Sequence, residues 1–205
     1  MLSLKTVFWI SVIFFGMMGA LRGWAKELVA AAGLVLSLFA IKTFGPFVLN
    51  VVGLADASLA NPIDPLQIYR RQFWILSSIH LFIAFVSYEG PTLSNVGTRL
   101  KRSDSVQDKL LGWIFGTLNG WLIIGTLFSF LEFRVQKSAI DGTFQFVRLL
   151  SGEQYPFSAE IVTRPLNALA LPVFQYLPLE LFSGSTLLLP LIMVALFLVI
   201  LIVIV

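Results

Sequence analysis

The chain has 205 residues, of which 58% are hydrophobic and 12% are charged. A soluble domain carries about 25% charged residues, so this low share, gathered between long apolar runs, indicates a membrane protein. The net charge of +3 does not indicate nucleic-acid binding, because Lys and Arg are spread over segments that flank apolar runs. The absence of Cys excludes disulfides, thiol catalysis and thiolate metal sites.

Five apolar runs predict an all-α, polytopic fold. They cover about 6–21, 28–52, 73–88 with an extension towards 96, 110–131 and 187–205. A bilayer core of about 30 Å needs about 20 helical residues, so the first four runs predict a four-helix transmembrane core, and the last predicts a fifth C-terminal helix. The runs lack a period of two, which argues against strands. We expect the first run to be retained rather than cleaved as a signal peptide, because Arg22 and a second run follow it.

The chain divides into a core at 1–132, an extracytoplasmic segment at 133–185 and the fifth helix at 186–205. The middle segment is too polar to span a membrane and too apolar to be a free linker. Its apolar residues from Ile140 to Leu150, and a similar set at 157–171, predict two short amphipathic helices on the outer membrane surface. A small packed cap over the bundle is an equally good interpretation. Pro and Asn residues predict that 55–72 is an irregular loop.

Basic residues in the short loops predict the orientation. Loops expected in the cytoplasm hold Arg22, Lys26, Arg99, Lys101, Arg102 and Lys109, against Lys5, Arg70 and Arg71 on the other side. The positive-inside rule therefore places the N-terminus outside, although Arg134 and Lys137 beyond the fourth run weaken the bias.

Glycines form a stripe on the fourth run. Gly112, Gly116 and Gly120 recur every four residues, and Gly16 and Gly19 give the first run a similar surface. Such stripes let two helix backbones approach closely. The stripe predicts either a homodimer seam or packing against the first run of the same chain, and we favour the second.

Charged residues lie where apolar runs begin and end. Arg22, Glu27 and Asp108 would meet at one membrane face if the first and fourth runs are neighbours. They form a candidate substrate or partner site. The favoured interpretation is that they are helix caps that match the helix dipoles.

Other intramembrane polar residues give weaker signals. His80 is the one histidine of the sequence and lies inside the third run without a carboxylate at helical spacing, so a metal site there is disfavoured. Lys42 is expected to extend outward to water, and Glu89 and Glu132 to lie at the interface. No catalytic or cofactor-binding motif is present in the sequence, so we expect neither enzyme activity nor a cofactor or metal.

Two segments resemble a known family. Arg22-Gly23-x-x-x-Glu27 and Asp108-Lys-Leu-Leu-Gly112-x-x-x-Gly116-x-x-x-Gly120 resemble the two signatures of the colicin V production (CvpA) family. The resemblance covers about 4–133 and makes Gly23 a further candidate for helix packing. The family commonly has Arg before the last glycine, where this chain has Asn119. The resemblance implies a bacterial inner-membrane protein tied to colicin V production or export, or to envelope homeostasis.

Three functions remain open from the sequence. The first is a non-enzymatic accessory or scaffold protein of the inner membrane. The second is a small transporter or channel lined by the charged cluster, with or without His80. The third is an accessory subunit of a larger complex, docked by the C-terminal helix. The expected partners are the lipid bilayer and either another membrane protein or a second copy of the chain.

Overall fold

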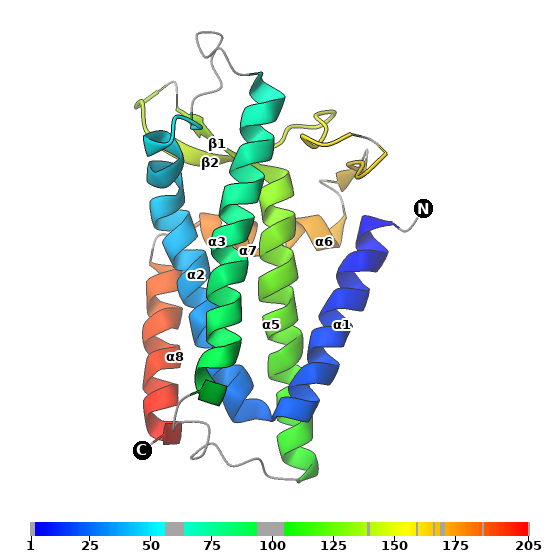
Figure 1. The fold of residues 1–205 in the computed structure, drawn as a ribbon, viewed down its shortest axis with the longest axis vertical. Helices are drawn as coiled ribbons and strands as arrows, with labels where there is room; N and C mark the ends of the chain where they lie inside the picture. The colour runs from blue at the N-terminus through cyan, green and yellow to red at the C-terminus, as the bar shows by residue number, and fades with distance from the viewer. Residues whose placement is uncertain are drawn as a thin grey trace.

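The structure is a computed structural model that describes residues 3–55, 64–93, 105–138, 140–158, 160–165, 167–168, 171–185 and 187–204. Long helices lie side by side, a small hairpin lies near one end of the bundle, and two short helices cross the bundle about halfway along its length (Figure 1). The elements are α1 (Leu4–Arg22), α2 (Trp24–Val51), α3 (Pro65–Leu93), α5 (Val106–Glu132), β1 (Phe133–Lys137), β2 (Phe144–Arg148), α6 (Pro172–Gln175), α7 (Pro178–Ser183) and α8 (Leu188–Ile204).

A single glycine separates the first two helices. The Ser3 hydroxyl caps α1 by accepting a hydrogen bond from the amide of Thr6. At the other end, Gly23 has φ +88°, and its amide donates to the carbonyl of Gly19. Only glycine adopts such a backbone without strain, so α1 stops here and α2 starts at the next residue.

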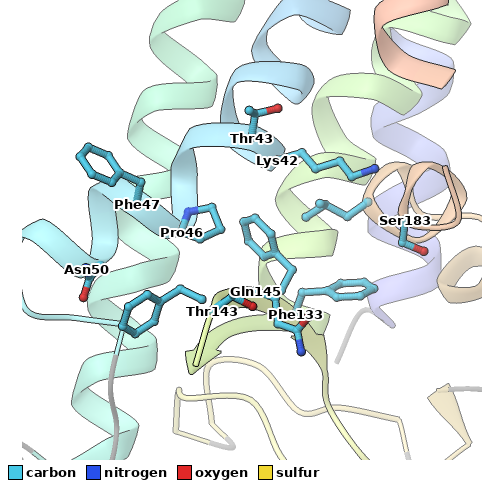
Figure 2. Close-up of a pocket in the computed structure, with 12 residues that line it drawn as sticks. Lys42, Thr43, Pro46, Phe47, Asn50, Phe133, Thr143, Gln145 and Ser183 are labelled. Carbon is cyan, nitrogen blue, oxygen red and sulfur yellow. The ribbon is translucent and has the colours of Figure 1, made fainter. Parts of the chain in front are cut away.

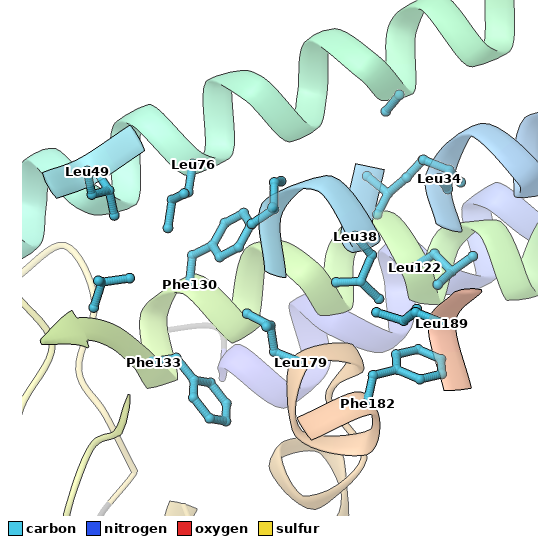
Figure 3. Close-up of a cluster of buried hydrophobic side chains, with 14 of the residues drawn as sticks. Leu34, Leu38, Leu49, Leu76, Leu122, Phe130, Phe133, Leu179, Phe182 and Leu189 are labelled. Carbon is cyan, nitrogen blue, oxygen red and sulfur yellow. The ribbon is translucent and has the colours of Figure 1, made fainter. Parts of the chain in front are cut away.

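The main core lies among α2, α3, α5, α7 and the start of α8 (Figure 3). Leu34 and Leu38 of α2 are fully buried there with Leu122 of α5 and Leu189 of α8. α1 lies outside this cluster and packs on α5 instead (Figure 1). The outer faces keep large exposed apolar side chains, such as Phe82 on α3, which is typical of a surface solvated by lipid.

Among the described residues, three helices are long and apolar enough to cross a membrane, namely α1, α2 and α5. A fourth is added if the segment Pro172–Ser183 is counted with α8 as one span bent by 90°. The chain is therefore a multi-pass membrane protein. The predicted all-α membrane core is confirmed for these three helices. α3 forms as expected and packs in the bundle. That α3 spans the membrane stays a prediction, and so does the prediction that α8 spans it without the preceding segment.

The segment after α5 differs from the prediction. Amphipathic helices were expected, but β1 and β2 form an antiparallel hairpin in which Phe133 pairs with Arg148 and Lys137 with Phe144. In β1 the buried residues Phe133 and Val135 alternate with more exposed ones, which is strand periodicity over too few residues to stand out in the sequence. Where 157–171 is described, it forms turns rather than an α-helix.

The packed-cap interpretation therefore holds for this segment. Leu149, Tyr155 and Phe174 are buried in it. Gln72 ties the cap to the bundle, because its side-chain amide accepts from the amide of Val135 (2.9 Å) and donates to the carbonyl of Val135 (2.9 Å).

The predicted loop at 55–72 is also shorter than expected. α3 begins at Pro65, a residue favoured in the first helical turn. Arg70 and Arg71 therefore belong to the helix, and the Arg70 guanidinium donates to the carbonyl of Pro156 in the cap (2.9 Å). The predicted turn at Asn61-Pro62, and the basic residues Arg99, Lys101 and Arg102, lie outside the described residues.

Candidate functional site

The glycine stripe of α5 packs against α1 of the same chain. A Cβ atom on Gly19 would lie 2.7 Å from the Cα of Gly116, and one on Gly116 would lie 2.5 Å from the carbonyl oxygen of Phe15. A Cβ on Gly120 would lie 2.6 Å from the Cβ of Phe15. Gly112 faces the carbonyl of Gly19 in the same way. The prediction of packing inside the chain is confirmed. Because α1 covers the stripe, the same glycines do not form a homodimer seam.

Gly16 lies at the edge of the same seam. A Cβ there would meet the side chains of Thr117 and Trp113. The backbones can approach this closely because neither helix has a side chain in the way, which favours dispersion and weak Cα–H···O contacts.

Glu27 lies at the centre of a buried polar node beside the seam. Its side chain is fully buried although it is only one turn into α2. One carboxylate oxygen accepts from Arg22 (3.1 Å), and the other accepts from the Tyr88 hydroxyl (3.1 Å) and from the Asn119 side-chain amide (2.8 Å). Asn119 also donates to the backbone carbonyl of Glu27 (2.9 Å). We call these four residues the Glu27 node.

The Arg22 guanidinium completes the node. It donates to the backbone carbonyl of Tyr88 (2.8 Å), and its carbon lies 4.4 Å from the centre of the Tyr88 ring. The node therefore joins α1, α2, α3 and α5 at one point. The buried Glu27 carboxylate is thus enclosed by Arg22 and two neutral donors. These hydrogen bonds offset the free-energy cost of removing the carboxylate from water.

Asp108 stands next to this node but is not part of it. It is buried in the first turn of α5, whose cap is Ser105. Its carboxylate lies beside Gly23, where a Cβ would be 3.1 Å from Oδ2. Among the described residues Asp108 makes no ion pair with Arg22. The predicted cluster is thus divided into an Arg22–Glu27 pair and an Asp108 at a helix start, and all three have the predicted capping positions.

A second buried node lies at the other end of α5 and was missed by the sequence interpretation. Glu132 was expected at the interface, but its side chain is fully buried. It accepts from the Tyr155 hydroxyl (2.6 Å) and twice from Arg164 (3.1 and 2.8 Å). Arg148 bridges the site to Glu180 (3.4 Å). We call Glu132, Tyr155 and Arg164 the Glu132 node.

The surroundings in the cap shift the pKa values of Tyr155 and Arg164. Burial, with the nearby charge and hydrogen bond of Glu132, raises the pKa of Tyr155 well above its ordinary value. Burial works against the charged form of Arg164, but the hydrogen bond and charge of Glu132 outweigh it and raise the pKa of Arg164. Arg164 also donates to the carbonyls of Leu149, Leu150 and Glu153, so one side chain holds several cap segments.

His80 is fully buried in the bundle. Its Nδ1 lies 2.9 Å from the hydroxyl of Ser37, its ring meets the edge of Phe130, and its Nε2 makes no well-formed hydrogen bond. No group of three His, Cys, Asp or Glu side chains that could hold a metal occurs in the described chain. His80 therefore lacks the neighbours that a metal site needs there.

Lys42 has backbone partners that the sequence did not predict. Its partly exposed side chain donates to the carbonyls of Phe182 and Ser185 (3.1 Å for the latter). These carbonyls stand at the C-terminal end of α7, where a cation complements unpaired backbone oxygens.

Tyr88 and Asn119 are the two members of the Glu27 node that the sequence did not single out as ligands of Glu27. The available signal was Asn119, because it stands where the family resemblance predicts a basic residue. In the structure the Asn119 side chain contacts the carboxylate of Glu27, the acidic residue of the first signature-like segment.

No family model, curated protein or solved structure matches this chain.

Proposed function

We propose that this protein is a non-enzymatic accessory or scaffold protein of a bacterial inner membrane, of the colicin V production type, with its N-terminus outside. The observation that carries the proposal is the closed Glu27 node. Its carboxylate is fully buried and accepts hydrogen bonds from three other helices. Such an arrangement holds a bundle in one shape, which is what a scaffold requires.

The same observation disfavours a transport path through the charged cluster. A path needs a carboxylate that exchanges partners with water or solute. Here both oxygens of Glu27 are occupied by protein donors, and Asp108 stands apart beside Gly23.

The contact between the two signature-like segments also supports the proposal. Gly23 lies against Asp108, and a Cβ on Gly112 would lie 3.3 Å from the amide nitrogen of Trp24. The resemblance therefore involves residues that meet in space, rather than two unrelated short matches. The orientation and the inner-membrane location are inferred from the basic loops and from the resemblance.

The accessory-subunit alternative has one observation in its favour. α8 has a wide exposed apolar surface, with Leu191 64%, Phe197 63% and Ile202 79% exposed. A helix that is apolar on all sides can contact either lipid or another membrane protein. In this alternative α8 docks on the larger complex.

A comparison of Glu27→Gln with wild type tests scaffold against transporter. Gln keeps the size and the acceptor oxygen but loses the charge. A scaffold predicts that wild-type proteoliposomes are no leakier to protons or small ions than empty liposomes. It also predicts that Glu27→Gln unfolds at a lower temperature in detergent and retains less of any partner that co-purifies stoichiometrically with the wild type. A wild-type leak that Glu27→Gln abolishes while its melting temperature is unchanged would overturn the proposal in favour of transport.

A further inference from the structure

A cavity of about 660 Å³ opens between α2, the hairpin and α7 (Figure 2). Polar groups line part of it, including Lys42 and Asn50 of α2 and Gln145 of the hairpin. Aromatic rings line the rest, including Phe47, Phe133 and Phe144. The cavity thus combines a cation with an apolar wall, as amphiphile sites do.

The charge of Lys42 is not neutralised in the described chain. Its two acceptors, the carbonyls of Phe182 and Ser185, carry no net charge. No carboxylate among the described residues forms an ion pair with Lys42, and the nearest acidic residue of α7, Glu180, pairs with Arg148. An ammonium has three N–H donors, so one donor remains for a ligand in the cavity.

Lys42 belongs to α2, a helix that is long and apolar enough to cross a membrane. It lies nine residues before Val51, or about 13 Å of helix from the end of α2. Charged side chains within such helices are rare and mark binding sites or ion pathways. The cavity residues Lys42, Pro46 and Asn50 follow one another at helical spacing, so the cavity runs from Lys42 towards the helix end.

We propose that this cavity binds the phosphate of an anionic glycerophospholipid, with Lys42 as its cationic contact. The apolar surroundings favour a lipid over a free phosphate. On the mid-membrane side of Lys42, Leu36 of α2 is 47% exposed, and Val194 and Phe197 of α8 beside it are 55% and 63% exposed, so these side chains can contact the acyl chains. Asn50, Thr143 and Ser183 supply neutral polar groups for the rest of the headgroup. The inference does not rest on the proposed scaffold role.

The test measures lipid binding to the full chain by native mass spectrometry of detergent-solubilised protein. The probes are phosphatidylglycerol, phosphatidylcholine and inorganic phosphate. We expect wild type to retain one phosphatidylglycerol in preference to phosphatidylcholine, whose own cation competes for the phosphate. Lys42→Met should weaken phosphatidylglycerol binding by roughly tenfold, the effect of losing one charge-assisted contact. Lys137→Met, which removes a hairpin cation outside the cavity, is the matched control and should bind as wild type does.

A second variant keeps the proposal testable if Lys42→Met does not fold. Asn50→Trp leaves Lys42 in place but fills the mouth of the cavity from an exposed position on α2. It should also lose the lipid. Phosphatidylglycerol binding that stays unchanged in Asn50→Trp, or in a folded Lys42→Met, overturns the proposal. Inorganic phosphate that binds wild type and displaces the lipid would show a soluble-anion site and would also overturn it.

Discussion

Asn119 donates one hydrogen bond to the carboxylate of Glu27 and another to the backbone carbonyl of the same residue, at 2.8 and 2.9 Å. One amide group thereby fixes both the side chain and the first turn of α2 against the middle of α5. The donor is neutral, so it adds no second positive charge to a carboxylate that already pairs with Arg22. Asn119 lies between Gly116 and Gly120 on α5. The glycine seam lets α1 and α5 approach closely, and this brings Asn119 within reach of Glu27.

Asn119→Leu should therefore lower the free energy of unfolding by about 1–3 kcal/mol, because it leaves buried acceptors of Glu27 without a donor. The measurement is thermal unfolding in detergent. Thr117→Val is the matched control on α5, since the Thr117 hydroxyl bonds only within its own helix, to the carbonyl of Trp113. Equal melting temperatures for the two variants would contradict the assigned role of Asn119.

Gly19→Ala should separate α1 from α5 and lower stability by about 1–3 kcal/mol, the usual cost of overpacking. The added Cβ would fall 2.7 Å from the Cα of Gly116, where no flexible side chain can move aside. Gly184→Ala is the control, because Gly184 has φ −70° and open space around its missing Cβ. The readout is the melting temperature of each variant, and a Gly19→Ala protein as stable as Gly184→Ala would argue against the seam.

Arg164→Met should lower the free energy of unfolding of the cap by about 3–5 kcal/mol, because it leaves Glu132 buried without its main partner. Limited trypsin digestion measures this, because a loosened cap exposes Arg134, Lys137 and Arg148 to cleavage. Arg71→Met, at an exposed position of α3, should leave the digestion rate unchanged. Arg164→Lys should restore only part of the protection, because Lys cannot reproduce the fork that contacts Glu132 and three backbone carbonyls. Full protection in Arg164→Met would refute the assignment.

Cap stability should fall at alkaline pH in a way that depends on Tyr155. Its pKa is raised in the folded state, by burial first and by Glu132 next, from an ordinary value of 10.0. The stabilising contribution is therefore fully present below pH 10 and is lost as the pH rises above it, because only the unfolded chain releases the proton there. Melting curves from pH 8 to about pH 11 should decline more steeply for wild type than for Tyr155→Phe. Identical slopes would show that Tyr155 does not titrate as inferred.

Much of the bundle was predictable because its signals are local. The long apolar runs gave α1, α2 and α5 nearly to their ends, and the spacing of Gly112, Gly116 and Gly120 gave the seam with α1. The hairpin was not predictable in the same way. Five-residue strands offer too few repeats to distinguish a period of two from a helical face.

The two nodes were harder to predict because they depend on which helices become neighbours. Glu27 was recognised as a charge at a helix start, but the contributions of Tyr88 and Asn119 follow only from the packing of α3 and α5. Glu132 ends an apolar run, so its sequence position suggested contact with water. Its burial results from Arg164, 32 residues later in the chain, which no local pattern connects to it.

The one-residue break at Gly23 also has a consequence for how the chain is made. α1 and α2 leave the ribosome as adjoining helices, yet the surface of α1 around Gly19 fits a helix that is synthesised much later. At about 5–20 residues per second, the Gly112–Gly120 segment emerges on the order of ten seconds after Gly19. During that interval the groove of α1 faces lipid or the insertion machinery. α1 thus enters the membrane before α5 but reaches its final packing only when α5 arrives.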